Sequence, residues 1–365
     1  MQNSNSLLPL SISPTVAIVE DIVRAAITTP SGDNCQPWEF HWDGSFLDVY
    51  HSDTRAAHAI NLANMASRLA FGCVLEAIEI AAHHHGYLSS VTLNVGGSHW
   101  GKISFRAGEG EKGHLYAQLW NRATNRKMYL RGSLEPIFRQ IVKPDEDDSG
   151  CKMYILGEPD PELRNRIADA ETLLLRTPIF HRDLMKWIRW SDSETELSRD
   201  GLGWRQLGIS FLESRIFKFA RNYSVQRVLN ALGFLSQYRR NIHRQIQSSS
   251  GLVLFTSPDR GPSALMPIGR LAFKTWLRLN GAGFAVQPYS LCSLYSFCRR
   301  AGAYEATETD FHSEVILRAA AAIRGGFRIP DGEYPVWMFR TGIAPPLKGT
   351  ERSLRLPLNS VFHRA

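Results

Sequence analysis

The chain has 365 residues, of which 44% are hydrophobic and 21% charged, a composition typical of a soluble globular protein with a large core. This length suits one to three domains, and no apolar run approaches the ~20 residues that a membrane-spanning helix requires. The net charge is +7, but no recognised nucleic-acid-binding motif accompanies it, so we expect no nucleic-acid partner.

The N-terminal residues and the cysteines both favour a cytoplasmic protein. Residues 1–14 lack a basic region followed by an apolar segment and a small-residue cleavage site, so secretion is not expected. The five cysteines are odd in number, scattered and without a C-x-x-C pair. We therefore predict reduced thiols rather than a disulfide framework, and we expect no metal centre.

The first predicted element is an amphipathic helix over 15–29, followed by a polar turn and a β-hairpin. The helix is indicated by apolar residues spaced i, i+3, i+4, i+7 and i+8, namely Val19, Ile22, Val23, Ala26 and Ile27. The turn starts at Pro30, and two strands, 39–42 and 45–51, follow around Asp43-Gly44. Such a turn suits hydrogen bonding to a planar polar ligand, and equally an ordinary helix-terminating loop.

The later elements repeat this mixture of helices and strands. We predict in order a helix 67–85, strands 91–95 and 103–105, helices 115–120 and 161–175, a strand 252–255, a helix 270–279 and a strand 336–342. Arg-Leu-Ala-Phe occurs at 68–71 and again at 270–273, which supports an internal repeat weakly. The predicted class is α+β, with a first half at 1–110 and a second at 111–365 that contains an insertion at about 180–250.

The turn at 30–38 reads Pro-Ser-x-x-Asn-x-Gln-Pro-Trp between a helix and a strand. This pattern resembles the signature of the nitroreductase superfamily, whose members carry FMN. The resemblance implies a nitroreductase-like fold. It also implies that the flavin ring and ribityl chain are bound by residues of this turn, namely Pro30, Ser31, Asn34 and Gln36.

Three further motifs resemble the same superfamily. Arg122-x-Thr124-x-Arg126 is similar to the motif that binds the FMN phosphate, a role suited to guanidinium groups because they bind phosphate bidentately. Arg355-Leu356-Pro357 is similar to the C-terminal motif that completes this phosphate site, and Arg352 is a further candidate. The segment 281–288 resembles the element beside the flavin ring, which implies roles for Gln287, Pro288 and Ser290.

The order of these motifs resembles the double-domain, Acg-like branch of the superfamily. The first half has the Ser/Asn turn but no preceding Arg motif, whereas the second half has the Arg motif but only a degraded turn near Thr177-Pro178. Each half lacks what the other supplies, as expected of an internal pseudo-dimer with one FMN site. Such a chain would bind FMN as a monomer, and nothing in the sequence requires further self-association.

The resemblance implies an FMN-dependent oxidoreductase that passes two electrons through flavin N5 to an unknown acceptor. We assign no catalytic side chain. Tyr289-Ser290-Leu291 stands where a typical nitroreductase has Glu-Gly, which leaves NAD(P)H open as the reductant. The alternatives are an FMN-sequestering protein with little turnover, and a biosynthetic flavin dehydrogenase or oxidase. The small-molecule substrate is not indicated by the sequence.

Four other features have less specific interpretations. The basic stretch 215–244 is typical of a solvated helix face, although such helices also bind anionic membranes or phosphates. Consecutive His83, His84 and His85 point in different directions on a helix, so we interpret them as a polar helix end rather than a metal site. Cys35 is interpreted as a small apolar residue rather than a redox group. Trp187 and Trp190 suit either core packing or a lid over the flavin.

Overall fold

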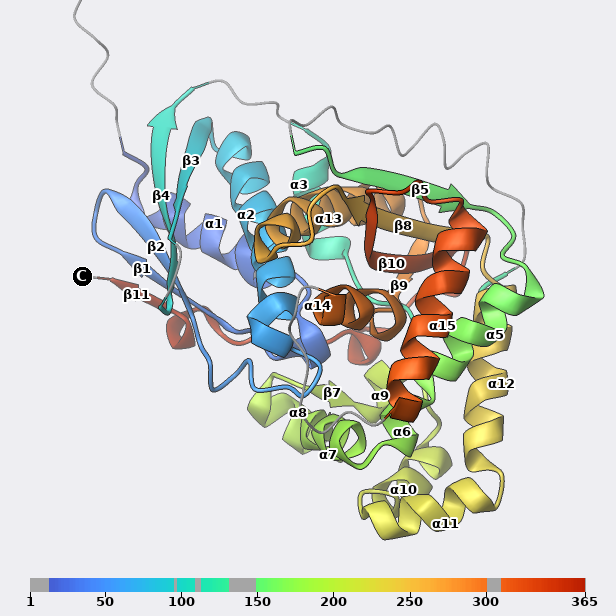
Figure 1. Ribbon diagram of the computed structural model, residues 1–365. Coiled ribbons are helices and arrows are strands. Elements are labelled where there is room, and N and C mark those ends of the chain that lie inside the picture. The colour runs from blue at the N-terminus through green and yellow to red at the C-terminus, as the bar shows by residue number, and fades with distance from the viewer. Residues whose placement is uncertain (1–12, 95–96, 109–112, 131–148, 301–309, 365) are drawn as a thin grey trace, which may run out of the picture.

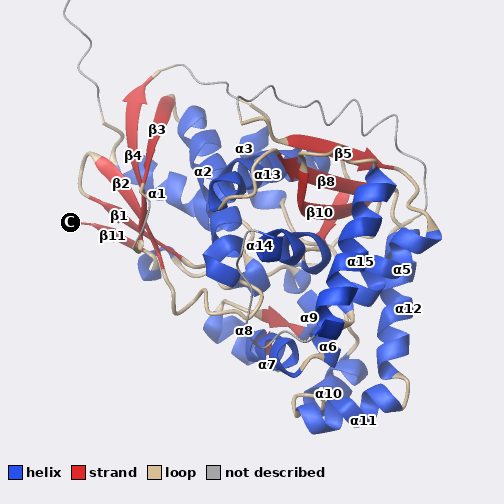
Figure 2. Cartoon of the chain, in the orientation of Figure 1, coloured by secondary structure: helices blue, strands red, loops and turns tan. Residues whose placement is uncertain are grey.

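The computed structural model describes residues 13–94, 97–108, 113–130, 149–300 and 310–364. Two sheets lie on either side of a central layer of helices, and further helices cover the outer face of the second sheet (Figures 1 and 2). The strand order is β11-β1-β2-β4-β3 in the first sheet and β5-β8-β10-β9 in the second. The predicted α+β class is confirmed.

The first sheet is built from the N-terminal part of the chain and one distant strand. β1 (Trp38–Trp42), β2 (Phe46–His51), β4 (His99–Ala107) and β3 (Tyr87–Leu93) are antiparallel neighbours. In β1 and β2 the buried side chains alternate with more exposed ones, as expected for a sheet with one face on the core. β11 (Phe362–Arg364) pairs in parallel with β1, and Figure 1 shows this red strand beside the blue ones.

The second sheet is antiparallel throughout. Its strands are β5 (Lys152–Leu156), β8 (Gly251–Ser257), β10 (Tyr334–Gly342) and β9 (Ala285–Pro288). Every residue of β8 is buried, so this sheet is covered on both faces. In Figure 1, α13 (Leu265–Gly281) lies on the side of the first sheet, and α5 (Pro161–Glu171) and α15 (Asp310–Phe327) lie on the opposite side.

The central layer contains α1 (Val16–Ile27), α2 (Met65–His84), α3 (Leu115–Asn121) and α13. α2 and α13 cross at a pair of glycines, and the two Arg-Leu-Ala-Phe sequences lie next to this crossing. Glu76 of α2, which is 2% exposed, accepts ion pairs from Arg270 at 3.1 Å and Lys274 at 3.2 Å of α13. These ion pairs therefore link α2 to α13 within the central layer of helices.

The predicted insertion at 180–250 is mainly helical. It contains α8 (Asp192–Ser198), α9 (Trp204–Leu207), α10 (Phe211–Phe219), α11 (Tyr223–Ala231) and α12 (Phe234–Gln247), besides a short parallel pair of β6 (Ile188–Arg189) and β7 (Leu202–Gly203). α6 (Leu173–Arg176) precedes it, α7 (Pro178–Trp187) spans its start, and α14 (Ser296–Arg300) precedes α15. Among the described residues, no helix combines the length and apolarity needed to cross a membrane.

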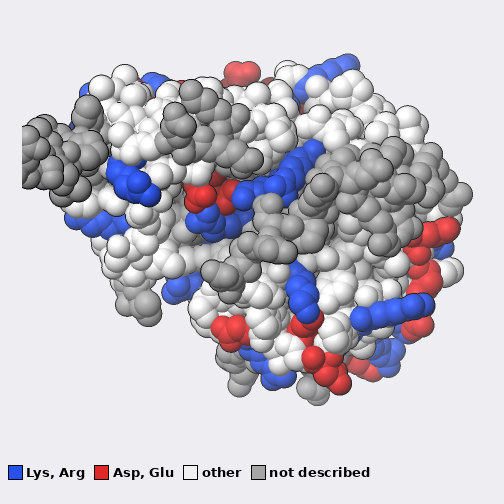
Figure 3. All heavy atoms as spheres, turned by 90° about the horizontal axis from the view of Figure 1, so that it is seen from above, with Lys and Arg blue, Asp and Glu red and all other residues white. Residues whose placement is uncertain are grey.

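The basic stretch 215–244 lies on α10, α11 and α12. Its basic side chains are largely exposed, as expected for a solvated helix face. However, large apolar side chains are exposed beside them, including Phe211, Leu212, Phe219 and Leu232 at 65, 71, 75 and 79%. On the face seen from above in Figure 3, some Lys and Arg atoms lie beside Asp and Glu atoms and others lie apart from them. The surface of α10 and α11 is thus apolar as well as basic.

Several predicted elements agree with the structure within a few residues. α1 begins after Thr15, whose side chain caps it, and α2, β1, β2, α3, β8, α13 and β10 lie where helices and strands were predicted. The predicted helix 161–175 is interrupted at Thr172 between α5 and α6. Residues 1–12, Val95 and the predicted boundary between the halves at 110 lie outside the described residues. That division stays a prediction.

Candidate functional site

The polar turn that follows α1 has an unusual backbone. Asp33, Asn34 and Gln36 have φ angles of 45°, 60° and 50°, in the left-handed region that non-glycine residues rarely adopt. Each such residue costs about 1–3 kcal/mol, and such strain is concentrated at functional sites. Ser31 helps to hold this conformation, because its Oγ accepts a hydrogen bond from the Gln36 amide at 2.9 Å.

The amide side chains of this turn bind two other segments of the chain. Nδ2 of Asn34 donates to the carbonyls of Gly201 at 3.2 Å and Leu354 at 3.0 Å. Nε2 of Gln36 donates to the Arg199 carbonyl at 3.0 Å, and its Oε1 accepts from the Leu356 amide at 2.8 Å. The turn therefore holds the insertion near 199–201 and the segment 354–356 against the first half.

A cavity of about 230 Å³ lies beside this turn. Four arginines reach it: Arg122 and Arg126 follow α3, and Arg352 and Arg355 precede β11. The described lining residues are Thr28, Pro30, Ser31, Asp33, Asn34, Leu119, Trp120, Arg122, Ala123, Thr124, Arg126, Leu202, Arg352, Ser353 and Arg355. Asp33 is the only acidic residue among these, so positive charge predominates in the cavity.

The arginines are positioned by neutral oxygens rather than by carboxylates. Arg122 and Arg355 both donate to the backbone carbonyl of Thr28, at 2.7 and 3.0 Å, so the end of α1 brings two guanidinium groups together. Arg355 also donates to Oδ1 of Asn34 at 2.7 Å. Arg126 donates to the Gln206 carbonyl at 2.9 Å, and Arg352 to the Trp120 carbonyl at 2.7 Å.

These charges are poorly compensated within the chain. Arg122 is 6% exposed, and burial together with the charge of Arg355 lowers its pKa well below the usual value. Burial and the nearby Arg352 lower the pKa of Arg355 to about 10. The Nε atoms of Arg122 and Arg355 are buried without a hydrogen-bond partner. A bound anion would supply negative charge to balance these guanidinium groups and oxygen acceptors for their unpaired Nε atoms, since buried charges are ordinarily paired.

The structure brings most, but not all, of the candidate residues of the sequence to this cavity. Pro30, Ser31, Asn34, Arg122, Thr124, Arg126, Arg352 and Arg355 line it. Gln36 lies in the same turn but is fully buried. The segment 281–288 is adjacent, because Thr124 forms a parallel bridge with Val286 of β9.

Gln287, Pro288 and Ser290 do not line this cavity. The side chain of Gln287 accepts a hydrogen bond from Nε of the fully buried Arg340 at 2.9 Å. Oγ of Ser290 accepts from Nε1 of Trp337 at 2.9 Å. Both side chains are thus engaged with β10, and the cavity beside the turn is formed without them.

Some residues at the site were not among the candidates. Thr28 acts through its backbone carbonyl, which no side-chain motif reveals. Leu202 lines the cavity from the insertion, next to Gly201, whose carbonyl Asn34 binds. Gly201 has a φ of 66°, and a Cβ there would lie 2.5 Å from the Trp187 carbonyl, so only glycine fits without rearrangement.

A second cluster lies on the other side of the turn. His58 stacks on Trp187, with ring centroids 4.5 Å apart, and lies 3.4 Å from Asp33 and 3.7 Å from Asp183. Burial opposes protonation, but the two carboxylates outweigh it and raise the pKa of His58 to about 11. Trp187 thus packs on His58 and does not line the arginine-lined cavity. Cys35 is buried near the same histidine.

No protein-family model matches the chain. Uncharacterized protein MT1398 of Mycobacterium tuberculosis (strain CDC 1551 / Oshkosh) is 26% identical over 310 residues, which is 79% of this chain. The chain spans 40% of the length of that relative.

Several solved structures similar to this chain are nitroreductases. The FMN and NADPH-dependent nitroreductase NfnB from Sphigopyxis sp. strain HMH is 12% identical, with a TM-score of 0.38, and the match covers 68% of this chain and 96% of that one. A nitroreductase with bound FMN from Desulfitobacterium hafniense DCB-2 is 13% identical, with a TM-score of 0.30, and the match covers 65% and 87%. These matches accord with the resemblance to the nitroreductase superfamily, but at TM-scores under 0.5 they carry no argument about the roles of residues in this chain.

Proposed function

We propose that this chain is an FMN-dependent oxidoreductase with one FMN site, formed by the cavity beside the turn at 30–37. The observation that carries the proposal is the convergence of four arginines on a cavity with a single aspartate, where two buried Nε atoms have no acceptor. A phosphate group fits this donor set, because guanidinium groups bind phosphate oxygens through paired, charge-assisted hydrogen bonds.

The two parts of the site would have different tasks. Arg122, Arg126, Arg352 and Arg355 would hold the phosphate, together with the hydroxyl of Thr124. The turn residues Pro30, Ser31, Asn34 and Gln36 would shape the part of the site that takes the ring and ribityl chain. Gln287 and Pro288 of β9, and Ser290 just after it, would support this part of the site. Asn34 would act partly by orienting Arg355, because the two side chains are hydrogen bonded at 2.7 Å.

Bound FMN would supply two-electron redox chemistry, and the side chains would bind it, orient it and limit access of water. No acid or base from the protein is needed for this role, and we assign none. NADH and NADPH are the candidate reductants. Tyr289, which stands where nitroreductases have Glu-Gly, is 2% exposed and donates a hydrogen bond to Gln245 at 2.9 Å.

The same contacts support a second candidate, an FMN-sequestering protein with little turnover. Asn34 and Gln36 hold the insertion at 199–201 across the turn, and Leu202 reaches the cavity. A segment held in this way would restrict access to bound FMN. Anaerobic stopped-flow reduction separates the two candidates. Rapid bleaching of the flavin by NADH or NADPH indicates an oxidoreductase, whereas bleaching by dithionite alone indicates sequestration.

The proposal is tested by purifying the chain and titrating it with FMN. We expect yellow protein that releases FMN on denaturation and saturates near one FMN per chain while it remains monomeric. A chain that is colourless and takes up no FMN on reconstitution would refute the proposal. Two FMN per chain, or FMN held only between two chains, would contradict the internal pseudo-dimer and leave FMN binding intact.

A further inference from the structure

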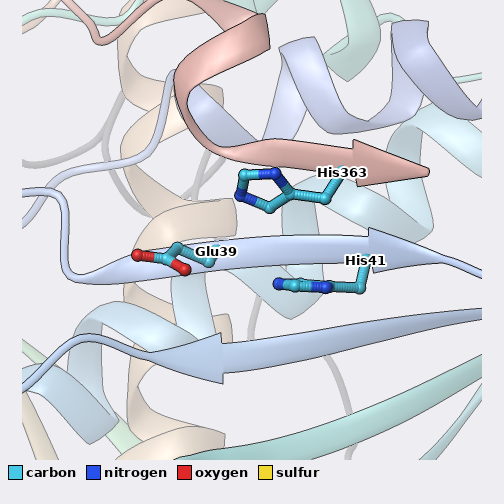
Figure 4. A group of neighbouring side chains, drawn as sticks. All are labelled: Glu39, His41 and His363. Carbon is cyan, nitrogen blue, oxygen red and sulfur yellow. The ribbon is translucent and has the colours of Figure 1, made fainter. Parts of the chain in front are cut away.

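Two histidines and a glutamate meet on the first sheet, away from the cavity residues. Glu39 and His41 are two residues apart on β1, so their side chains lie on the same face of the sheet. His363 of β11 is the direct partner of His41 in the parallel pairing. Figure 4 shows the two imidazole rings on neighbouring strands, on the same side as the Glu39 carboxylate.

These side chains have the donor atoms and the spacing of a metal site. One ligand atom from each residue can be chosen so that all three lie within 4.8 Å of one another. Imidazole nitrogen and carboxylate oxygen are ordinary Zn²⁺ ligands, at about 2.0–2.2 Å from the ion, and three protein ligands plus water complete a tetrahedral site. The required ligand-to-ligand spacing is shorter, about 3.3 Å. His41 and His363 are both exposed and can close this gap by small side-chain rotations toward each other.

The neighbouring groups leave the ligand atoms available. Glu39 has a loose ion pair with Arg55 at 3.7 Å, and both side chains are about one-third exposed. Such pairs contribute little, so a divalent ion can displace Arg55. The ring of Tyr50 packs on His41 at 4.7 Å and restricts its movement on the side away from β11. Asp48, the partner of His41 on β2, accepts a hydrogen bond from His99 at 2.7 Å and adds negative charge nearby.

We propose that Glu39, His41 and His363 form a binding site for a divalent transition-metal ion, best suited to Zn²⁺, that fastens β11 to β1. β11 is the strand that such a site would stabilise. β11 has only three residues and lies at the edge of its sheet, where it pairs with β1 alone. A metal ligated from both strands adds a cross-link where few backbone hydrogen bonds are available.

The site connects two segments that approach the arginine-lined cavity. β1 begins at Trp38, directly after the strained turn, and β11 follows the segment that carries Arg352 and Arg355. A metal that holds β1 and β11 together would therefore restrain both segments. This consequence rests on the proposed function, whereas the metal site itself does not.

The site is tested by titrating the full-length, FMN-free chain with Zn²⁺ in competition with a chromophoric chelator. We expect one tight site per chain, and His41→Ala and His363→Ala should each weaken it at least about tenfold. His83→Ala, at the end of α2, is the matched control and should bind as the parent does. Absence of saturable binding, or equal affinity of all three variants and the parent, overturns the proposal.

The fastening of β11 is tested separately by hydrogen exchange. Zn²⁺ should slow amide exchange in the peptide that contains 362–364 in the parent chain and not in His363→Ala. Exchange that is unchanged by bound Zn²⁺ overturns the fastening. Both measurements are made without FMN, so a failure of the proposed flavin function does not affect their outcome.

Discussion

Gly72 of α2 and Gly269 of α13 face each other where the two central helices cross. A Cβ on Gly72 would lie 2.9 Å from the Cα of Gly269, and a Cβ on Gly269 would lie 3.0 Å from the Cα of Gly72. The two backbones are therefore in direct contact, and no side chain larger than hydrogen fits at either position. This contact allows α2 and α13 to pack closely.

Replacing either glycine by alanine should separate the helices. For Gly72→Ala and Gly269→Ala we expect a loss of about 3 kcal/mol or more in the free energy of unfolding, because the obstructing atoms are backbone rather than flexible side chains. Urea denaturation measures this loss. Gly325→Ala in α15 is the control, since its Cβ would meet no atom within 4 Å. This control should gain up to about 1 kcal/mol from helix propensity.

Arg126→Ala should weaken FMN binding by about 1.5–3 kcal/mol, the contribution of a hydrogen bond to a charged group. The far-ultraviolet circular dichroism should be unchanged, because Arg126 lines a cavity and is not part of the core. Fluorescence titration with FMN measures the effect. Arg318→Ala, on the exposed surface of α15, serves as the control and should bind FMN normally. An unchanged affinity of Arg126→Ala would show that the phosphate site is elsewhere.

Inorganic phosphate alone should stabilise the FMN-free protein. Burial lowers the pKa values of Arg122 and Arg355, and so do the charges of neighbouring arginines, Arg355 for the first and Arg352 for the second. A bound anion therefore relieves an unfavourable state of the folded chain. At a phosphate concentration 100 times Kd the gain would be about 2.7 kcal/mol, seen as a higher Tm. Chloride at equal ionic strength is the control. A similar rise of Tm in Arg355→Ala would argue against binding at this cavity.

Glu171 should make the stability of the protein depend on pH. Its buried carboxyl group has an Oε1 atom without a partner, and burial raises its pKa from 4.5 to about 7, against a backbone hydrogen bond to Leu291 that lowers it. The folded state then holds a proton that the unfolded state loses between pH 4.5 and 7. The contribution of this group to stability is full below pH 4.5 and declines as the pH rises through 7.

Glu171→Gln removes this titration. Relative to the parent, the variant should become more stable with rising pH, by at most about 3 kcal/mol, and the difference should level off above pH 8. Urea denaturation from pH 5 to pH 8 measures it. Glu162→Gln, exposed on the same helix, should show no such trend. A constant difference between the Glu171 variant and the parent would mean that this carboxyl group is ionised in the folded chain.

The sequence predicted the elements that carry strong periodic or turn signals. α1 has an uninterrupted apolar stripe, and Asp43-Gly44 lies between the strands β1 and β2. The short strand β11 was not predicted, because Phe362, His363 and Arg364 carry no pattern, and its pairing with β1 depends on the whole fold. The helices of the insertion also gave no reliable individual bounds.

At the site, the sequence predicted the side chains but not the contacts that position them. Motifs identified the arginines and the polar turn, which the structure brings to one cavity. They did not indicate that the Thr28 carbonyl binds two of the arginines, because a carbonyl is common to every residue. Nor did they indicate that Gln287 is engaged with Arg340, a contact that depends on the register of β9 against β10. His363 is separated from His41 by most of the sequence, so spacing could not pair them.

The pairing of β1 with β11 also has a consequence for the order of folding. Arg355 bonds to Asn34, 321 residues earlier in the sequence, and the edge of the first sheet is completed by the strand just after Arg355. During synthesis the turn at 30–37 therefore emerges from the ribosome long before the partners that hold it. Contacts of such high sequence separation form late and slowly, since the intervening chain must first become ordered. Until then one edge of β1 is unpaired, and the arginine-lined cavity becomes complete only when the segment carrying Arg352 and Arg355 has folded.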